Sequence, residues 1–129
     1  MPADVTRVPN EPIVIVIITP PPDPVSEVGE VARTIATMFR GETGPIYRIN
    51  DFTAVNLSFG ELVVGLGLET KGDPGTFTDP RIKTVFVGTS EMVELGAKSM
   101  RQEHYGGLDI LLFATLEDAL AHIRAELRP

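Results

Sequence analysis

Runs of apolar residues along the chain alternate with segments of mixed polarity. The run Ile13–Ile18, IVIVII, is rich in β-branched residues and predicts a strand that is buried on both faces. The segments Pro45–Ile49, Ile82–Gly88 and Asp109–Ala114 predict three further strands. A short β-prone segment, Val5–Val8, precedes the turn PNEP and allows an antiparallel hairpin with the first run.

Between the strands, apolar side chains recur every three or four residues, which is the spacing of an amphipathic helix. Asp23 before Pro24 is a favourable helix start, and Ser58 with Glu61 has the pattern of a capping box. The predicted helices run from Pro24 to Phe39, from Phe59 to Glu69, from Thr89 or Ser90 to about His104, and from Thr115 to Leu127.

The order of these elements predicts an α/β fold. Two strands lead, and helices then alternate with strands to the end of the chain. Strands separated by helices of this length pair in parallel through right-handed crossovers. We therefore expect a single domain over residues 1–129, with four or five mostly parallel strands and four helices. Residues 1–11 are either an antiparallel edge strand or loose.

Composition and charge exclude several classes of function. The chain has no cysteine, so it has no disulfide framework, thiolate metal site or cysteine nucleophile. Its net charge is −7, which disfavours nucleic acid and anionic membrane surfaces as partners. The longest apolar run is too short to cross a bilayer, which takes about 20 residues. We expect a cytoplasmic protein.

Small polar residues gather where the predicted strands end and the helices begin. The carboxyl ends of parallel strands share one edge, where open α/β sheets bind ligands and helix N-termini favour anions. The same residue types also cap helices and form turns, so a purely structural role is the competing interpretation. The binding or switch candidates at this edge are Asp51, Thr53, Asn56, Ser58, Thr89 and Ser90, with Asp23 and Thr115 beside them.

The segment from Thr70 to Pro80 is a loop without a known ligand-binding pattern. It lacks the Gly-Lys-Ser/Thr ending of a phosphate-binding loop and the alternating oxygen ligands of a calcium loop. Its Asp-Pro-Gly and Asp-Pro sequences favour tight turns. The loop is therefore a surface turn or a partner contact, and Phe77 would be its exposed anchor.

The two histidines of the chain suggest no catalytic or metal site. Neither His104 nor His122 has a carboxylate or nucleophilic serine at a spacing typical of a triad. Two histidines and scattered acids likewise lack the spacing of a metal site. We expect no metal and no cofactor.

Several sequence motifs in the chain resemble those of the SpoIIAA-like branch of the STAS family. This family has the fold of sulfate transporters and anti-sigma-factor antagonists. The motifs are IYRINDFTAVNLSFGEL, VFVGTSEM and LLFATLEDALAHI, and the resemblance runs from about Ile13 to Arg128. It would place the phosphorylatable serine of the family at Ser58 and its strand-end aspartate at Asp51. The family usually has Asp before that serine, whereas this chain has Leu57 before it and Phe59 after it. The resemblance therefore implies a relative without a working phospho-serine switch.

Three functions remain open on this basis. The first is a non-enzymatic regulatory domain that binds another protein, with a homodimer as a further expectation. The second is a binder of a small apolar or anionic ligand, or a weak enzyme with Asp51 as base, at the carboxyl edge of the sheet. The third is an inert structural module, which predicts neither ligand nor partner.

Overall fold

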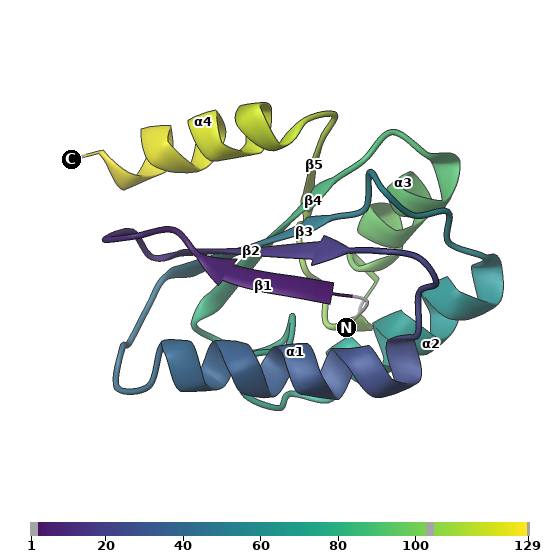
Figure 1. The fold of residues 1–129 in the computed structure, drawn as a ribbon, viewed down its shortest axis with the longest axis horizontal. Helices are drawn as coiled ribbons and strands as arrows, with labels where there is room; N and C mark the ends of the chain where they lie inside the picture. The colour runs from purple at the N-terminus through teal and green to yellow at the C-terminus, as the bar shows by residue number, and fades with distance from the viewer. Residues whose placement is uncertain (1–2, 103–104, 129) are drawn as a thin grey trace.

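A β-sheet organises the molecule (Figure 1). The computed structural model describes residues 3–102 and 105–128, and within them five strands follow the spatial order β1-β2-β3-β4-β5. β1 pairs antiparallel with β2, and every later pair is parallel. The predicted α/β fold with an antiparallel edge strand is confirmed. The strands are β1 (Ala3–Arg7), β2 (Ile13–Ile18), β3 (Ile46–Asp51), β4 (Ile82–Val87) and β5 (Leu111–Phe113).

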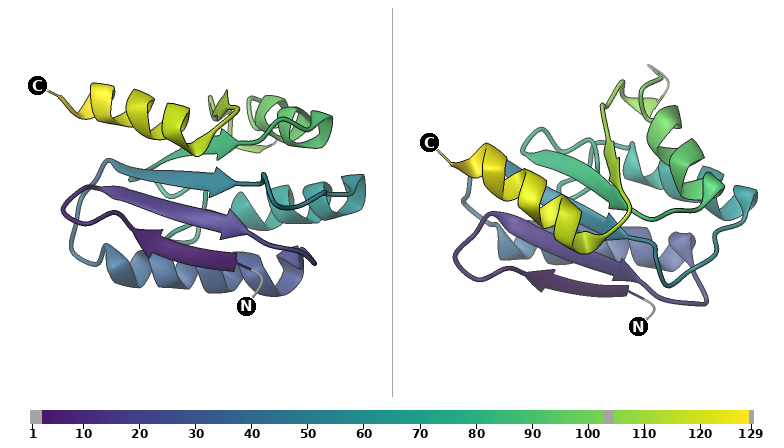
Figure 2. Two further views of the ribbon diagram at one scale, coloured as in Figure 1. Left: turned by 45° about the horizontal axis from the view of Figure 1, so that its top comes forward. Right: turned by 90° about the horizontal axis from the view of Figure 1, so that it is seen from above.

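Helices cover both faces of this sheet. α1 (Pro24–Met38), α2 (Phe59–Glu69) and α3 (Glu91–Ser99) lie on one face, and α4 (Leu116–Leu127) lies on the other (Figures 1 and 2). Right-handed crossovers between successive neighbouring strands put the connecting helices on the same face. α4 follows β5 and is not a crossover between two of the described strands, so this rule does not fix the face on which it lies. Over the described residues, no helix is both long and apolar enough to cross a membrane.

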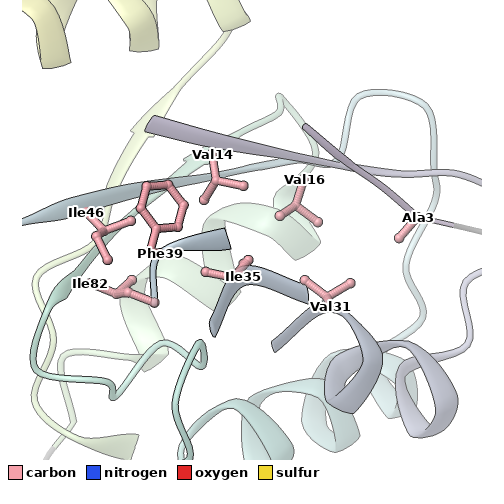
Figure 3. Close-up of a cluster of buried hydrophobic side chains, with 8 residues drawn as sticks. All are labelled: Ala3, Val14, Val16, Val31, Ile35, Phe39, Ile46 and Ile82. Carbon is pink, nitrogen blue, oxygen red and sulfur yellow. The ribbon is translucent and has the colours of Figure 1, made fainter. Parts of the chain in front are cut away.

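The core follows the alternation of side chains along each strand. In β4, Phe86 packs with α2 and α3, whereas Val85 and Val87 pack with Ala119 and Ile123 of α4. Figure 3 shows a further cluster, in which α1 packs against the sheet. Its buried members are Ala3, Val14, Val16, Val31, Ile35, Phe39, Ile46 and Ile82.

Each helix begins with a side-chain cap. The side chains of Asp23 and Thr115 accept hydrogen bonds from the backbone at the starts of α1 and α4. At α2, Ser58 Oγ accepts from the Glu61 N–H at 3.1 Å and Glu61 Oε1 accepts from the Ser58 N–H at 2.8 Å. The predicted capping box is therefore confirmed. Ser90, and not Thr89, caps α3.

Several element boundaries differ from the prediction: those of β1 and β3 shift by up to two residues, and α3 and β5 are shorter than predicted. α3 ends at Ser99, because the chain turns there and the fully buried Met100 accepts a hydrogen bond from the Leu108 N–H at 2.7 Å. His104, the predicted helix end, lies outside the described residues. β5 is three residues long, because only Leu111–Phe113 pairs with β4.

The loop between α2 and β4 packs against the sheet through Phe77. Phe77 is 3% exposed, so the prediction of an exposed anchor was wrong. Its ring packs against Phe86 at 5.5 Å between ring centroids, and the Arg48 guanidinium lies 4.6 Å from its centre. Within the loop, Asp79 accepts a hydrogen bond from the Gly75 N–H at 2.9 Å.

Candidate ligand pocket between two helices and the sheet

A pocket opens between α1, α2 and the carboxyl-terminal half of β3. Its volume is about 80 Å³. A single water needs only about 10–15 Å³ measured in this way, whereas pockets for drug-sized ligands hold about 300–1,000 Å³. The pocket therefore suits a small molecule or one group of a larger one. Most of its walls are apolar, and they include Ile18, Val28, Val31, Phe52, Leu62, Leu66, Phe77, Phe86 and Val93.

A buried ion pair forms the polar floor of the pocket. Arg48 and Asn50 are two residues apart in β3, so their side chains lie on the same face of the sheet. The guanidinium of Arg48 donates to both carboxylate oxygens of Glu69 at 3.0 and 2.7 Å. It also donates to Asn50 Oδ1 and to the carbonyl oxygen of Gly75, both at 2.9 Å. This one side chain connects β3, α2 and the loop before β4.

The acid of this pair is almost fully enclosed. Burial raises the pKa of the Glu69 carboxyl, and the neighbouring Arg48 guanidinium works against that rise. Because Arg48 donates to both oxygens of Glu69, the positive and negative charges at the floor of the pocket balance each other.

Glu27 on α1 is a second buried acid, and it is only half satisfied. One oxygen accepts a hydrogen bond from the backbone N–H of Asp23. The other, Oε2, is shielded from solvent and accepts no hydrogen bond from the described part of the chain. Burial raises the pKa of Glu27, and the charges of Asp23 and Glu30 add to the rise, while the Asp23 N–H opposes it. A buried polar atom without a partner is uncommon, and here it belongs to a residue of the pocket wall.

The predicted candidates at the sheet edge have structural partners instead. Asp51 Oδ1 accepts hydrogen bonds from the backbone N–H and the hydroxyl of Thr53, at 2.9 and 2.7 Å. Asp51 and Asn50 are consecutive in β3 and therefore point to opposite faces, so only Asn50 reaches the pocket. Ser58 and Ser90 cap their helices.

The other two candidates, Asn56 and Thr89, are exposed. Parallel pairing does bring the ends of β3 and β4 together, with Asp51 opposite Val87. However, the pocket lining does not include any of the six candidates. Three residues from the same part of the sequence do line it, namely Phe52, Leu57 and Glu61.

The polar pocket residues that the sequence interpretation missed are Glu27, Arg48, Asn50 and Glu69. A signal existed for two of them. Arg48 and Asn50 occupy alternate positions in the strand IYRIND, so a charged and an amide side chain share one face of the strand with Ile46. Nothing in the spacing of Glu27 or Glu69 distinguishes these acids from solvent-exposed ones on their helices.

The opposite face of the sheet holds a separate polar group. Glu126 on α4 accepts a hydrogen bond from the Tyr47 hydroxyl at 2.9 Å and lies 2.6 Å from His122 Nε2. Burial and the neighbouring Glu126 raise the pKa of Tyr47. Across residues 3–102 and 105–128, no three His, Asp or Glu side chains are placed to hold a metal ion.

Neither a scan against protein-family models nor a search of curated proteins finds a match to this chain. The resemblance to STAS domains therefore stays a prediction.

Proposed function

We propose that this chain is a non-enzymatic binding domain that holds a small, largely apolar ligand in the pocket between α1, α2 and β3. The observation that carries the proposal is the buried Oε2 of Glu27, which has no hydrogen-bond partner in the described chain although Glu27 lines an apolar pocket. Small-molecule sites typically combine apolar walls with a few polar groups that orient the ligand. Glu27 would be such a group.

The other polar residues of the pocket favour binding over catalysis. Arg48 and Glu69 satisfy each other, and Glu61 accepts the Ser58 N–H in the capping box. A catalytic acid or base lies within hydrogen-bond reach of the proton that it transfers, and a catalytic site usually places a nucleophile or a charge-stabilising group beside it. The neighbours of Glu27 are mainly apolar side chains, which can hold a ligand but cannot activate it.

Binding can be tested with a neutral apolar probe and two matched glycine variants of α2. Gly65 lines the pocket, and a Cβ at that position would meet Pro24 across it at 3.8 Å. A Cβ at Gly67, two residues later, would meet nothing within 4 Å. We expect benzene to shift the amide resonances around Asn50 and Leu62 in the wild-type protein and in Gly67→Leu, but not in Gly65→Leu. Equal shifts in all three proteins would exclude this pocket as the binding site.

Exposed apolar residues on α2 support a second candidate function, contact with another protein. Phe59 is 62% exposed, and Val63 and Val64 are about 40% exposed. A helix that is apolar on most of its surface is usually covered on more than one side. This supports the regulatory, STAS-like role expected from the sequence, in which the partner is another protein or a second copy of the chain.

The homodimer can be tested by sedimentation velocity over a range of concentrations. We expect the wild-type protein to sediment faster as its concentration rises, and Phe59→Ser to sediment as a monomer throughout. A wild-type protein that stays monomeric at every concentration would exclude self-association.

A further inference from the structure

We propose that the pocket selects a small organic cation, specifically a primary alkylammonium whose N–H groups donate to Glu27 Oε2. This inference rests on the proposed function, because it names the class of ligand that the same pocket takes. It depends on three observations: the unpartnered oxygen of Glu27, the excess of acid in the lining, and the aromatic walls.

The charges of the lining favour a cation. Glu27, Glu61 and Glu69 line the pocket, and Arg48 is the lone basic residue among the described lining residues. Glu69 already neutralises Arg48 through the two-pronged ion pair. Two carboxylates therefore remain without a counter-charge in the lining. An anionic ligand, one of the sequence-based expectations, would meet repulsion here.

The hydrogen-bonding needs of the pocket match an ammonium group. Glu27 is 5% exposed and its Oε2 is closed to solvent, so a ligand in the pocket meets this oxygen once the Glu27 carboxylate turns toward it. An ammonium group has three donors and no acceptor. One donor would satisfy Glu27 Oε2, and the amide oxygen of Asn50, which accepts one hydrogen bond from Arg48, has a second lone pair for another. A neutral alcohol offers one donor and no positive charge. A carboxylate offers no donor, and its charge is negative.

The aromatic walls suit the same ligand. Phe52 and Phe86 lie edge to face with their centroids 5.1 Å apart, and both line the pocket. Ring faces attract cations and ring edges pack against alkyl chains. Phe77 already packs against a cation in this site, the Arg48 guanidinium. The volume of about 80 Å³ limits the enclosed part of the ligand to the ammonium group and a short chain.

The experiment compares three ligands of four carbon atoms each and similar size: n-butylammonium, n-butanol and butyrate. Each is titrated into the ¹⁵N-labelled protein at neutral pH, and the dissociation constant is read from amide shifts. We expect butylammonium to bind about tenfold more tightly than butanol or better, because a charge-assisted hydrogen bond replaces a neutral one. We expect butyrate not to bind.

Two variants identify the group responsible. Glu27→Gln should reduce the affinity for butylammonium to that for butanol and leave butanol unchanged. Glu117→Gln removes the same charge from an exposed position at the start of α4, on the opposite face, and should bind like the wild-type protein. The ranking of the three ligands on the wild-type protein tests the inference even if Glu27→Gln does not fold.

The outcomes separate this inference from the proposed function. Equal binding of butylammonium and butanol would overturn the preference for a cation but leave the apolar pocket as a binding site. Tighter binding of butylammonium that persists in Glu27→Gln would overturn the role of Glu27. If neither these ligands nor benzene bind, the proposed function itself fails.

Discussion

Arg48 in β3 and Glu69 in α2 are 21 residues apart in sequence, yet they form a two-pronged ion pair that solvent hardly reaches. The side chains of the two residues are 1% and 5% exposed. A buried pair of this kind contributes little net stability compared with a well-packed apolar pair. Loss of one partner is costly, however, because the other charge is left buried and unpaired.

Arg48→Met should therefore destabilise the protein by roughly 3–5 kcal/mol, whereas Arg48→Met combined with Glu69→Leu should recover much of that loss. Urea denaturation of both variants measures the free energy of unfolding. Lys98→Met is the matched control, because it removes a cation from the exposed Glu94–Lys98 pair and should cost at most about 1 kcal/mol. A single variant as stable as the wild-type protein would show that Glu69 does not need Arg48.

Glu27→Gln should become more stable relative to the wild-type protein as the pH rises. The pKa of Glu27 is raised in the folded chain, so the folded state keeps a proton that the unfolded state releases near the usual value of 4.5. The stability that this proton contributes is full below that value and is lost as the pH rises through the raised pKa. The variant has no such proton, so its melting temperature should rise relative to that of the wild type as the pH increases from about 4.5 through the raised pKa of Glu27. A difference that does not change with pH would mean that Glu27 titrates normally.

Gly75→Ala should be strongly destabilising. Gly75 has φ +87°, and a Cβ there would lie 2.1 Å from the carbonyl oxygen of Ala32 in α1. Gly41 has a similar φ, +82°, but a Cβ there would meet nothing within 4 Å. Gly41→Ala should cost roughly 1–2 kcal/mol from backbone strain alone, and Gly75→Ala should cost clearly more. Thermal unfolding of both variants compares the two costs, and equal losses would contradict the close approach of the loop to α1.

Ser58→Ala should cost about 1 kcal/mol, because the Glu61 N–H loses its acceptor at the start of α2. Chemical denaturation measures the loss. Asn56→Ala is a suitable control, since Asn56 is exposed and lies outside the helix. A loss no larger than that of the control would mean that the capping box contributes nothing.

The fold could be predicted because its signals are local. The apolar run of β2, the caps at Asp23 and Ser58, and the regular alternation of helix and strand each depend on neighbouring residues. The end of α3 was missed because it depends on a distant contact, the hydrogen bond from Leu108 to the buried carbonyl of Met100.

The pocket could not be predicted in the same way. The small polar residues at the sheet edge favour a site there, but Asp51 forms a turn with Thr53, and Ser58 and Ser90 cap helices. The buried acids of the pocket are Glu27 and Glu69, which differ from exposed acids only in what packs around them. Such burial is a property of the assembled layers, since it requires α1, α2 and the loop before β4 to come together.

Because Phe77 is buried, chymotrypsin cleavage of the loop before β4 can report whether the pocket is occupied. Chymotrypsin cleaves after phenylalanine only when it can bind the side chain, and here that side chain forms part of the pocket wall. Cleavage at Phe77 therefore requires a local opening that also separates the ring from Arg48. A ligand in the pocket would hold the ring in place, so bound protein should resist chymotrypsin longer at this site than free protein. A loop that the sequence indicates to be a surface turn would then act as an indicator of whether the pocket is occupied.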